Sequence, residues 1–171
     1  MSETKEVDSF RYIDGLTRRI VKGWIEREPP ISDIPWTELQ KPLEDCTVAL
    51  ISSAGVCLNE DQPFDQEGER ENPWWGDPSY RVIPKTATEQ DIKVCHLHID
   101  PRFAEEDLNC VLPLERLNGL EGAKKIGRSA ANHYSFMGYI LKPDVLLSES
   151  APAMIQGLQA DEVDAVVLLP V

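Results

Sequence analysis

Apolar residues follow two kinds of pattern along the chain, a helical spacing near its start and short continuous runs farther on. The helical pattern predicts an amphipathic helix over residues 9–28, which ends before Pro29. Its apolar positions, three or four residues apart, are Phe10, Ile13, Leu16, Ile20 and Trp24. Residues 29–42 contain four prolines, so we expect them to form an extended strap across the domain.

The continuous apolar runs predict four strands, at residues 47–52, 92–99, 143–148 and 163–169. The run at 166–169 is typical of a parallel strand buried on both faces. Helices are predicted at 114–120 and 151–160. Strands that alternate with helices predict an α/β fold, here a three-layer sandwich with a mainly parallel sheet of flavodoxin or Rossmann type. We expect residues 1–171 to form one such domain, incomplete at its C-terminus, with the helix and the strap packed on it.

The charge of the chain narrows the choice of partners. Thirty acidic and seventeen basic residues give the 171 residues a formal charge of −13, which repels phosphate backbones and anionic membrane surfaces. We therefore expect no nucleic-acid partner and no membrane partner. No apolar stretch is long enough for a bilayer span or a signal peptide, so a cytoplasmic location is expected. Residues 59–77, which hold seven carboxylates and one arginine, are interpreted as a solvated loop.

Polar residues gather where the predicted parallel strands end. Ser52 and Ser53 follow the first strand, and His96 and His98 lie two residues apart on the second, hence on one face. We expect a cleft at this edge, lined by the turn after Ser52 and by one of the two histidines. The histidines suit a metal pair, a proton relay or a purely structural role. The structural role is favoured, and no metal or other cofactor is predicted, because zinc needs a third ligand. His133 is a further candidate, and it would complete a three-histidine site if it lay nearby.

Three more polar side chains are candidates for substrate binding. Asp77 and Pro78 begin a turn, and this turn does not account for Tyr80 and Arg81, of which the arginine could bind a carboxylate through two hydrogen bonds. Asn109 belongs to a second polar group with Asp107 and Arg116, near Pro113, where the alternative roles are a helix cap for Asp107 and a solvated side chain for Arg116.

The four cysteines, Cys46, Cys57, Cys95 and Cys110, form no C-x-x-C motif. Free cysteine is often a small core residue, and we interpret most of these four in that way rather than as redox or metal-binding groups.

Several motifs occur in a fixed order from Phe10 onward. They are IPWT at 34–37, DPSYR at 77–81, HLHID at 96–100, DLN at 107–109, PLERL at 113–117 and HYSFMG at 133–138. Motifs in register are more specific than any single one. Together they resemble the selenoprotein B family of the glycine, sarcosine, betaine and D-proline reductases, nearest to its shorter, D-proline-reductase-like members.

This resemblance implies reductive cleavage of a C–N bond in a small amino-acid-like substrate, with a dithiol donor and a pyruvoyl-bearing partner subunit. It also implies a selenocysteine or cysteine nucleophile just after a strand like the one at 163–169, so we expect the nucleophile after Val171. Three accounts stay open: a UGA selenocysteine codon read as a stop, a deliberate truncation, and a degenerate paralogue.

Two other functions remain as alternatives. The first is a non-catalytic module that binds a small molecule or acts as a scaffold. The second is a metal-binding protein that uses His96 and His98. In each case an apolar strand face left uncovered at the C-terminal end favours self-association, so we expect a homo-oligomer.

Overall fold

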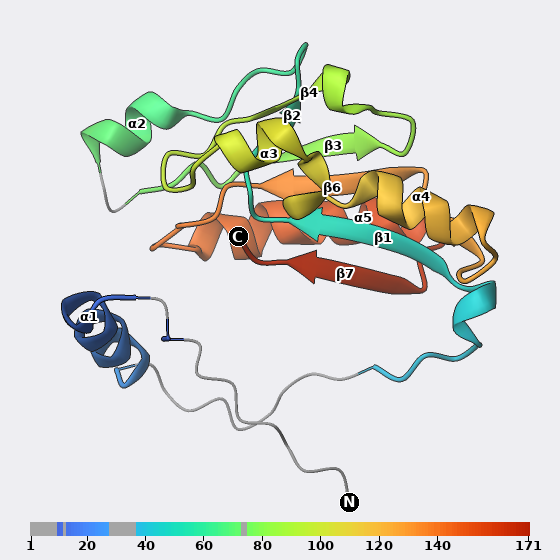
Figure 1. Ribbon diagram of the computed structural model, residues 1–171, viewed down its shortest axis with the longest axis horizontal. Helices are drawn as coiled ribbons and strands as arrows, with labels where there is room; N and C mark the ends of the chain where they lie inside the picture. The colour runs from blue at the N-terminus through green and yellow to red at the C-terminus, as the bar shows by residue number, and fades with distance from the viewer. Residues whose placement is uncertain (1–9, 12, 28–36, 73–74) are drawn as a thin grey trace, which may run out of the picture. The chain divides into compact units, whose positions relative to one another are not determined.

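The computed structural model describes residues 10–11, 13–27, 37–72 and 75–171, which group into two units, Met1–Glu38 and Leu39–Val171 (Figure 1). In the first unit, helix α1 (Gly15–Ile25) begins at Asp14, whose carboxylate accepts hydrogen bonds from the backbone N–H groups of Leu16 and Thr17. The helix is shorter than the predicted 9–28. Residues 9, 12 and 28 of the predicted helix and residues 29–36 of the predicted strap lie outside the described residues, and the packing of helix and strap on the domain stays a prediction.

The second unit is an α/β structure built on a mixed, mostly parallel sheet. Strand β1 (Thr47–Ser52) is central, and it pairs in parallel with three strands: β5 (Arg128–Ser129), β6 (Asn132–Phe136) and β7 (Ala165–Leu169). Strand β3 (Tyr80–Pro84) runs antiparallel to β6 and forms one edge of this sheet. A separate antiparallel pair consists of β2 (Val56–Leu58) and β4 (Ile92–Val94).

Helices cover the sheet and complete the core. In Figure 1, α4 (Leu114–Gly122) lies in front of the sheet with α3 (Arg102–Glu106), and α5 (Ala151–Ala160) lies behind it. The remaining helix is α2 (Gln66–Glu71), and single turns occur at Leu43–Asp45, Glu89–Asp91 and Leu108–Cys110. Alternate residues of β1, Val48 and Leu50, pack with Leu114 and Leu117 of α4, as its strand periodicity requires. Among the described residues, no helix has the length and apolar character needed to span a bilayer.

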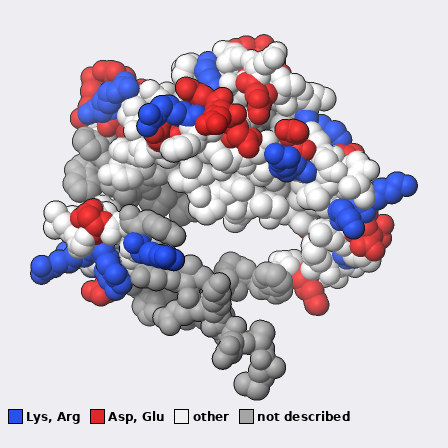
Figure 2. All heavy atoms as spheres, in the orientation of Figure 1, with Lys and Arg blue, Asp and Glu red and all other residues white. Residues whose placement is uncertain are grey.

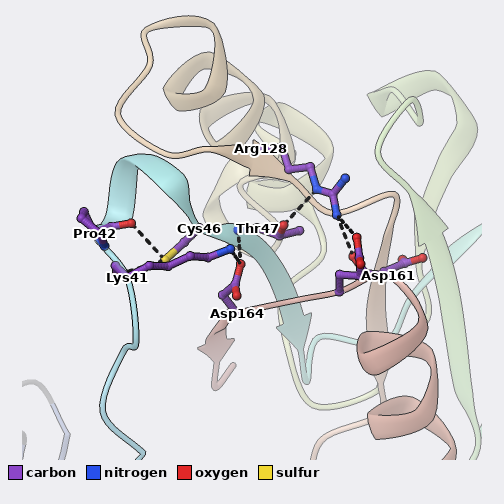
Figure 3. Close-up of polar contacts among 8 residues, drawn as sticks. Lys41, Pro42, Cys46, Thr47, Arg128, Asp161 and Asp164 are labelled. Atoms are coloured by element: carbon purple, nitrogen blue, oxygen red, sulfur yellow. Dashed lines mark hydrogen bonds and ion pairs between the residues drawn. The ribbon is translucent and has the colours of Figure 1, made fainter.

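Polar contacts fix the amino ends of β1 and β7 (Figure 3). The Asp164 carboxylate accepts hydrogen bonds from the Thr47 N–H at 2.8 Å and from Lys41 Nζ at 2.7 Å. Arg128 donates from Nε to Thr47 Oγ1 at 2.9 Å and from its terminal nitrogen to the Asp161 carbonyl at 3.3 Å. These contacts pin the register of neighbouring strands, and this in turn aligns their carboxyl ends.

The strand predicted at 92–99 ends early, at Val94. Residues 95–100 form a turn, in which the His98 N–H donates to His96 Nδ1 at 3.0 Å instead of to a neighbouring strand. The prediction that both histidines lie on one strand face was therefore wrong. An alternating pattern predicts a strand only where a partner strand accepts its hydrogen bonds.

The strand predicted at 143–148 was also wrong, because this segment is helical. The Leu147 N–H donates to the Pro143 carbonyl at 2.8 Å, and the π-helical turn Leu146–Ser150 continues directly into α5. A short apolar run does not distinguish a strand from a helix, and here the helical turn leaves Leu147 65% exposed.

The strand predicted at 163–169 is confirmed as β7, but its predicted burial on both faces was wrong. Val166, Val167 and Leu168 are 37%, 43% and 69% exposed. Among the described strands β7 pairs with β1 alone, so it is an edge strand. The sequence pattern missed β2, β3, β5 and β6, which are short or lie in segments rich in polar residues.

Candidate functional site

The carboxyl ends of β1, β6 and β7 meet at one edge of the sheet, and Ser53 joins them. Its N–H donates to the Leu169 carbonyl at 3.1 Å, and its carbonyl accepts from the Gly138 N–H at 2.7 Å. Its hydroxyl oxygen accepts from the Val171 N–H at 2.9 Å. In open parallel sheets, ligands bind and reacting groups lie just beyond the carboxyl ends of the strands.

His96 lies against these strand ends. Its Nδ1 accepts the hydrogen bond from the His98 N–H, which places the proton of the neutral ring on Nε2. A Cβ atom on Gly138 would lie 3.0 Å from that Nε2 and 3.0 Å from the Ser53 carbonyl oxygen, so only glycine leaves room for the ring. Burial, and then the neighbouring charge of His98, lower the pKa of His96. The ring is therefore held neutral, with an N–H available to a ligand.

Glu69 reaches the same place from α2, although it is 3% exposed. Its Oε1 lies 2.5 Å from His98 Nε2, and the His98 ring stacks on Tyr139 with 4.0 Å between ring centroids. The His98 side chain is 44% exposed. A carboxylate on one imidazole nitrogen orients the ring and leaves Nδ1 to exchange a proton with a ligand.

Ser53, Glu69, His96, His98 and Tyr139 form what we call the histidine cluster. Two buried polar atoms in this cluster lack a hydrogen-bond partner within the described part of the chain, Glu69 Oε2 and His96 Nε2. A buried group without a partner costs free energy, and such groups are often completed by a ligand or water. One is an acceptor on a carboxylate, and the other is a donor in the neutral ring. Together they suit a small molecule that carries both an N–H donor and a hydrogen-bond acceptor.

Of the eight predicted site residues, three therefore lie together at this edge: Ser53, His96 and His98. Ser52 lies next to them in sequence, but its buried hydroxyl donates to the Val111 carbonyl at 2.8 Å and stabilises the loop before α4.

Arg81 is committed to its own neighbourhood and does not reach the cluster. Its Nε donates to the Gln62 carbonyl at 2.9 Å, and one terminal nitrogen donates to the Ser79 hydroxyl and the Tyr80 carbonyl. Its guanidinium also stacks on Phe64 at 4.2 Å. Tyr80 packs against Tyr134, with ring centroids 6.0 Å apart. Arg81 thus fixes the turn that precedes β3, and its role in substrate binding stays a prediction.

Asn109 and His133 lie elsewhere in the fold. Asn109 donates to the Asp107 carboxylate at 2.8 Å and borders a cavity of about 660 Å³ next to α4, distinct from the histidine cluster. His133 is fully buried in β6, where Nδ1 accepts from the Leu50 N–H at 3.0 Å and Nε2 lies 3.2 Å from the Ser129 hydroxyl. In the described ranges, no three His, Cys, Asp or Glu side chains are grouped to hold a metal ion.

Sequence reasoning missed Glu69 and Tyr139. Glu69 is one of seven carboxylates in a segment that we interpreted as a solvated loop, and nothing in its local pattern distinguishes it from its exposed neighbour Glu67. Its partner His98 lies 29 residues away, so only the folded chain identifies it.

The chain is thus a mostly parallel α/β protein with a partly buried group of histidine and carboxylate side chains at its strand ends, the place where ligands commonly bind in such sheets. Residues 2–170 match the family described as glycine/sarcosine/betaine reductase selenoprotein B, and the chain belongs to that family. The resemblance inferred from the motifs is confirmed.

Two curated relatives are informative. The chain is 34% identical over 151 residues to D-proline reductase subunit gamma of Acetoanaerobium sticklandii. This alignment covers 87% of the chain and 59% of the relative. It is 28% identical over 134 residues to betaine reductase complex component B subunit beta of Peptoclostridium acidaminophilum. This second alignment covers 76% of the chain and 30% of the relative. The chain thus spans less than two thirds of either relative, and both relatives are named as subunits of reductases. No solved structure matches the chain.

Proposed function

We propose that the chain is part of a selenoprotein-B-type reductase that cleaves a C–N bond of a small amino acid or amine. The dithiol donor, the pyruvoyl-bearing partner subunit and the three-layer flavodoxin-like arrangement belong to the same proposal. Family membership and the names of the two relatives support it. In the net reaction a C–N bond and two thiols become a C–H bond, an N–H bond and a disulfide.

The observation that carries the proposal is the Glu69–His98 pair, which lies beside His96 at the carboxyl ends of β1, β6 and β7. When a selenolate or thiolate attacks carbon, the nitrogen leaves with the bonding electrons and needs a proton. His98 in its imidazolium form, oriented by Glu69, supplies that proton from Nδ1 to an amine that binds in its neutral form. The unpaired oxygen of Glu69 accepts a hydrogen bond from the N–H of the substrate amine, and in this proposal the nucleophile follows Val171.

The test is dithiol-dependent reduction of D-proline, glycine, sarcosine and betaine by the full protein together with its partner subunit. Glu69→Gln and His98→Asn should each lower kcat by roughly 10²-fold or more, because general acid catalysis contributes about that much. Glu67→Gln is the matched control on the same helix, since Glu67 is 76% exposed and pairs only weakly with Arg70, at 3.4 Å. Equal turnover by Glu69→Gln and Glu67→Gln would remove the cluster from the mechanism.

A binding module without chemistry is the second candidate, because the unpaired Glu69 oxygen suits an ammonium group whether or not a reaction follows. Calorimetry separates the two functions. Binding of one substrate that depends on Glu69, without turnover in the complete reductase, would favour the binding module.

A further inference from the structure

A second reactive group lies beside this cluster, formed by two cysteines that the sequence pattern did not connect. Cys57 is in β2, and Cys95 directly follows β4. The antiparallel register sets Cys57 opposite Lys93, two residues before Cys95, so both cysteine side chains emerge on the same face. Their Sγ atoms are 3.3 Å apart and buried, with 0% and 8% of the two residues exposed. A spacing of 38 residues hides this pair from any C-x-x-C search.

The surroundings divide the two thiols into a nucleophile and a proton holder. The hydrogen bond from Cys57 is the main influence that lowers the pKa of Cys95, with smaller contributions from Lys93 and the Phe64 N–H. The same hydrogen bond, together with burial, raises the pKa of Cys57. Lys93 and the Phe64 N–H favour a negative charge on Cys95, so Cys95 is the sulfur of the pair that ionises more readily, and a thiolate is the form that reacts with oxidants.

Packing holds the two sulfur atoms in place. Phe64 and Met137 complete a small buried cluster with the two cysteines, and the Cys95 N–H donates to the Gly55 carbonyl at 2.8 Å. A disulfide needs a sulfur separation of about 2.05 Å, so the atoms must approach by roughly 1 Å, a shift within reach of side-chain rotation. Since the cluster admits little solvent, the oxidant must be small.

We propose that Cys57 and Cys95 form a reversible redox site that a hydroperoxide oxidises to a disulfide. The Cys95 thiolate attacks the peroxide oxygen, the O–O bond breaks, and Cys95 becomes a sulfenic acid as hydroxide or alkoxide leaves. Cys57 then attacks the Cys95 sulfur, its proton and the sulfenic hydroxyl leave as water, and the S–S bond forms. Two thiols are oxidised by two electrons and one peroxide is reduced. A dithiol reverses the change by exchange.

The position of the pair next to His96 gives this site a connection to the candidate active site. Cys95 and His96 share a peptide bond in the turn that carries both histidines. The disulfide itself does not depend on the proposed reductase function, and it is tested without any reductase assay.

The experiment treats the reduced full chain with hydrogen peroxide in a Cys110→Ser background, because Cys110 is exposed and would form disulfides between molecules. Intact mass should fall by two hydrogen atoms, peptide mapping should join Cys57 to Cys95, and dithiothreitol should restore both thiols. The oxidation rate should rise with pH and level off below the value of about 8.5 at which a free cysteine peptide is half ionised.

Two single substitutions divide the steps. Cys57→Ser should stop oxidation at a Cys95 sulfenic acid that dimedone traps, and Cys95→Ser should leave Cys57 reduced. Cys46→Ser is the control, since the buried Cys46 thiol donates to the Pro42 carbonyl at 3.3 Å, away from the pair. If a variant does not fold, peptide mapping of the chain with both cysteines intact still shows whether the disulfide between Cys57 and Cys95 forms. The proposal would be overturned if Cys57 and Cys95 stayed reduced at a peroxide concentration that oxidises a free cysteine peptide. A disulfide between either of them and Cys46 would overturn it as well.

Discussion

At the scale of single residues, His133 shows how burial sets protonation. Its ring is fully buried in β6 and hydrogen-bonded at both nitrogens. Burial lowers the pKa of His133 to about 4, and the positive charge of Lys85 adds to this effect. The residue is an acceptor for the N–H of β1, so its role is to hold two strands together.

This burial predicts a pH dependence of stability. Below the unfolded value of about 6.5, the unfolded chain binds a proton at His133 that the folded chain does not, so the free energy of unfolding falls as pH falls from about 6.5 to about 4. The full loss is up to about 3 kcal/mol, since one pKa unit corresponds to about 1.4 kcal/mol. Urea unfolding at pH 7 and at pH 4.5 measures it.

His133→Asn is the comparison, because the Asn amide oxygen can accept the Leu50 N–H but does not take up a proton. The variant should be less stable than the wild type at pH 7 and should lose less stability on acidification. Parallel losses in the two proteins would show that other groups control acid unfolding.

At the scale of elements, α5 approaches the sheet through a glycine. A methyl group on Gly157 would overlap the hydroxyl oxygen of Tyr134 in β6, and Tyr134 is itself buried. The absence of a side chain at Gly157 therefore sets how closely the helix and the sheet pack.

Two glycine substitutions separate this contact from helix propensity. Gly157→Ala should destabilise the protein by about 1–3 kcal/mol, because overpacking forces the helix or the tyrosine to move. Gly119→Ala, inside α4 with no atom within 4 Å of the added carbon, should stabilise it by about 0.5–1 kcal/mol. Thermal unfolding of both variants gives the two values, and a neutral Gly157→Ala would mean that Tyr134 relocates without cost.

At the scale of the whole molecule, β7 is the notable surface feature. Figure 2 is almost entirely white, hence without charged side chains, at the lower edge of the larger unit where Figure 1 shows β7. Val167 and Leu168 are exposed there, and the strand carries neither the lysine nor the proline that usually protects an edge. Such an edge favours pairing with the same strand of a second copy.

We expect the chain to sediment as a dimer or larger homo-oligomer at micromolar concentration, and Leu168→Lys to shift it toward monomer. The charge would have to be buried in the pair of edges, at a cost of several kcal/mol, but it stays in water in the monomer. Glu162→Lys, an exposed change before the strand, is the control. A monomeric wild type would contradict this prediction.

The elements that the sequence predicted well share one property, a signal carried by adjacent residues. The runs at 47–52 and 163–169 became β1 and β7, and the helix predicted at 114–120 became α4. The segments at 92–99 and 143–148 had similar runs, yet β4 ends where its pairing with β2 ends, and residues 143–148 form a helical turn closed by local hydrogen bonds. In the site, Ser53 was predicted from its place after the first strand and the two histidines from a strand that ends before them, whereas Glu69 was not predicted.

The sequence by itself determined the family and the α/β class, because the order of motifs and the apolar runs are local properties. Only the tertiary structure decided which groups meet. It paired Glu69 with His98 across 29 residues and Cys57 with Cys95 across 38, and it withdrew Arg81, Asn109 and His133 from the cluster. The physical reason is that these contacts form between strands, turns and helices whose register is set by long-range hydrogen bonds and packing, which no local pattern specifies.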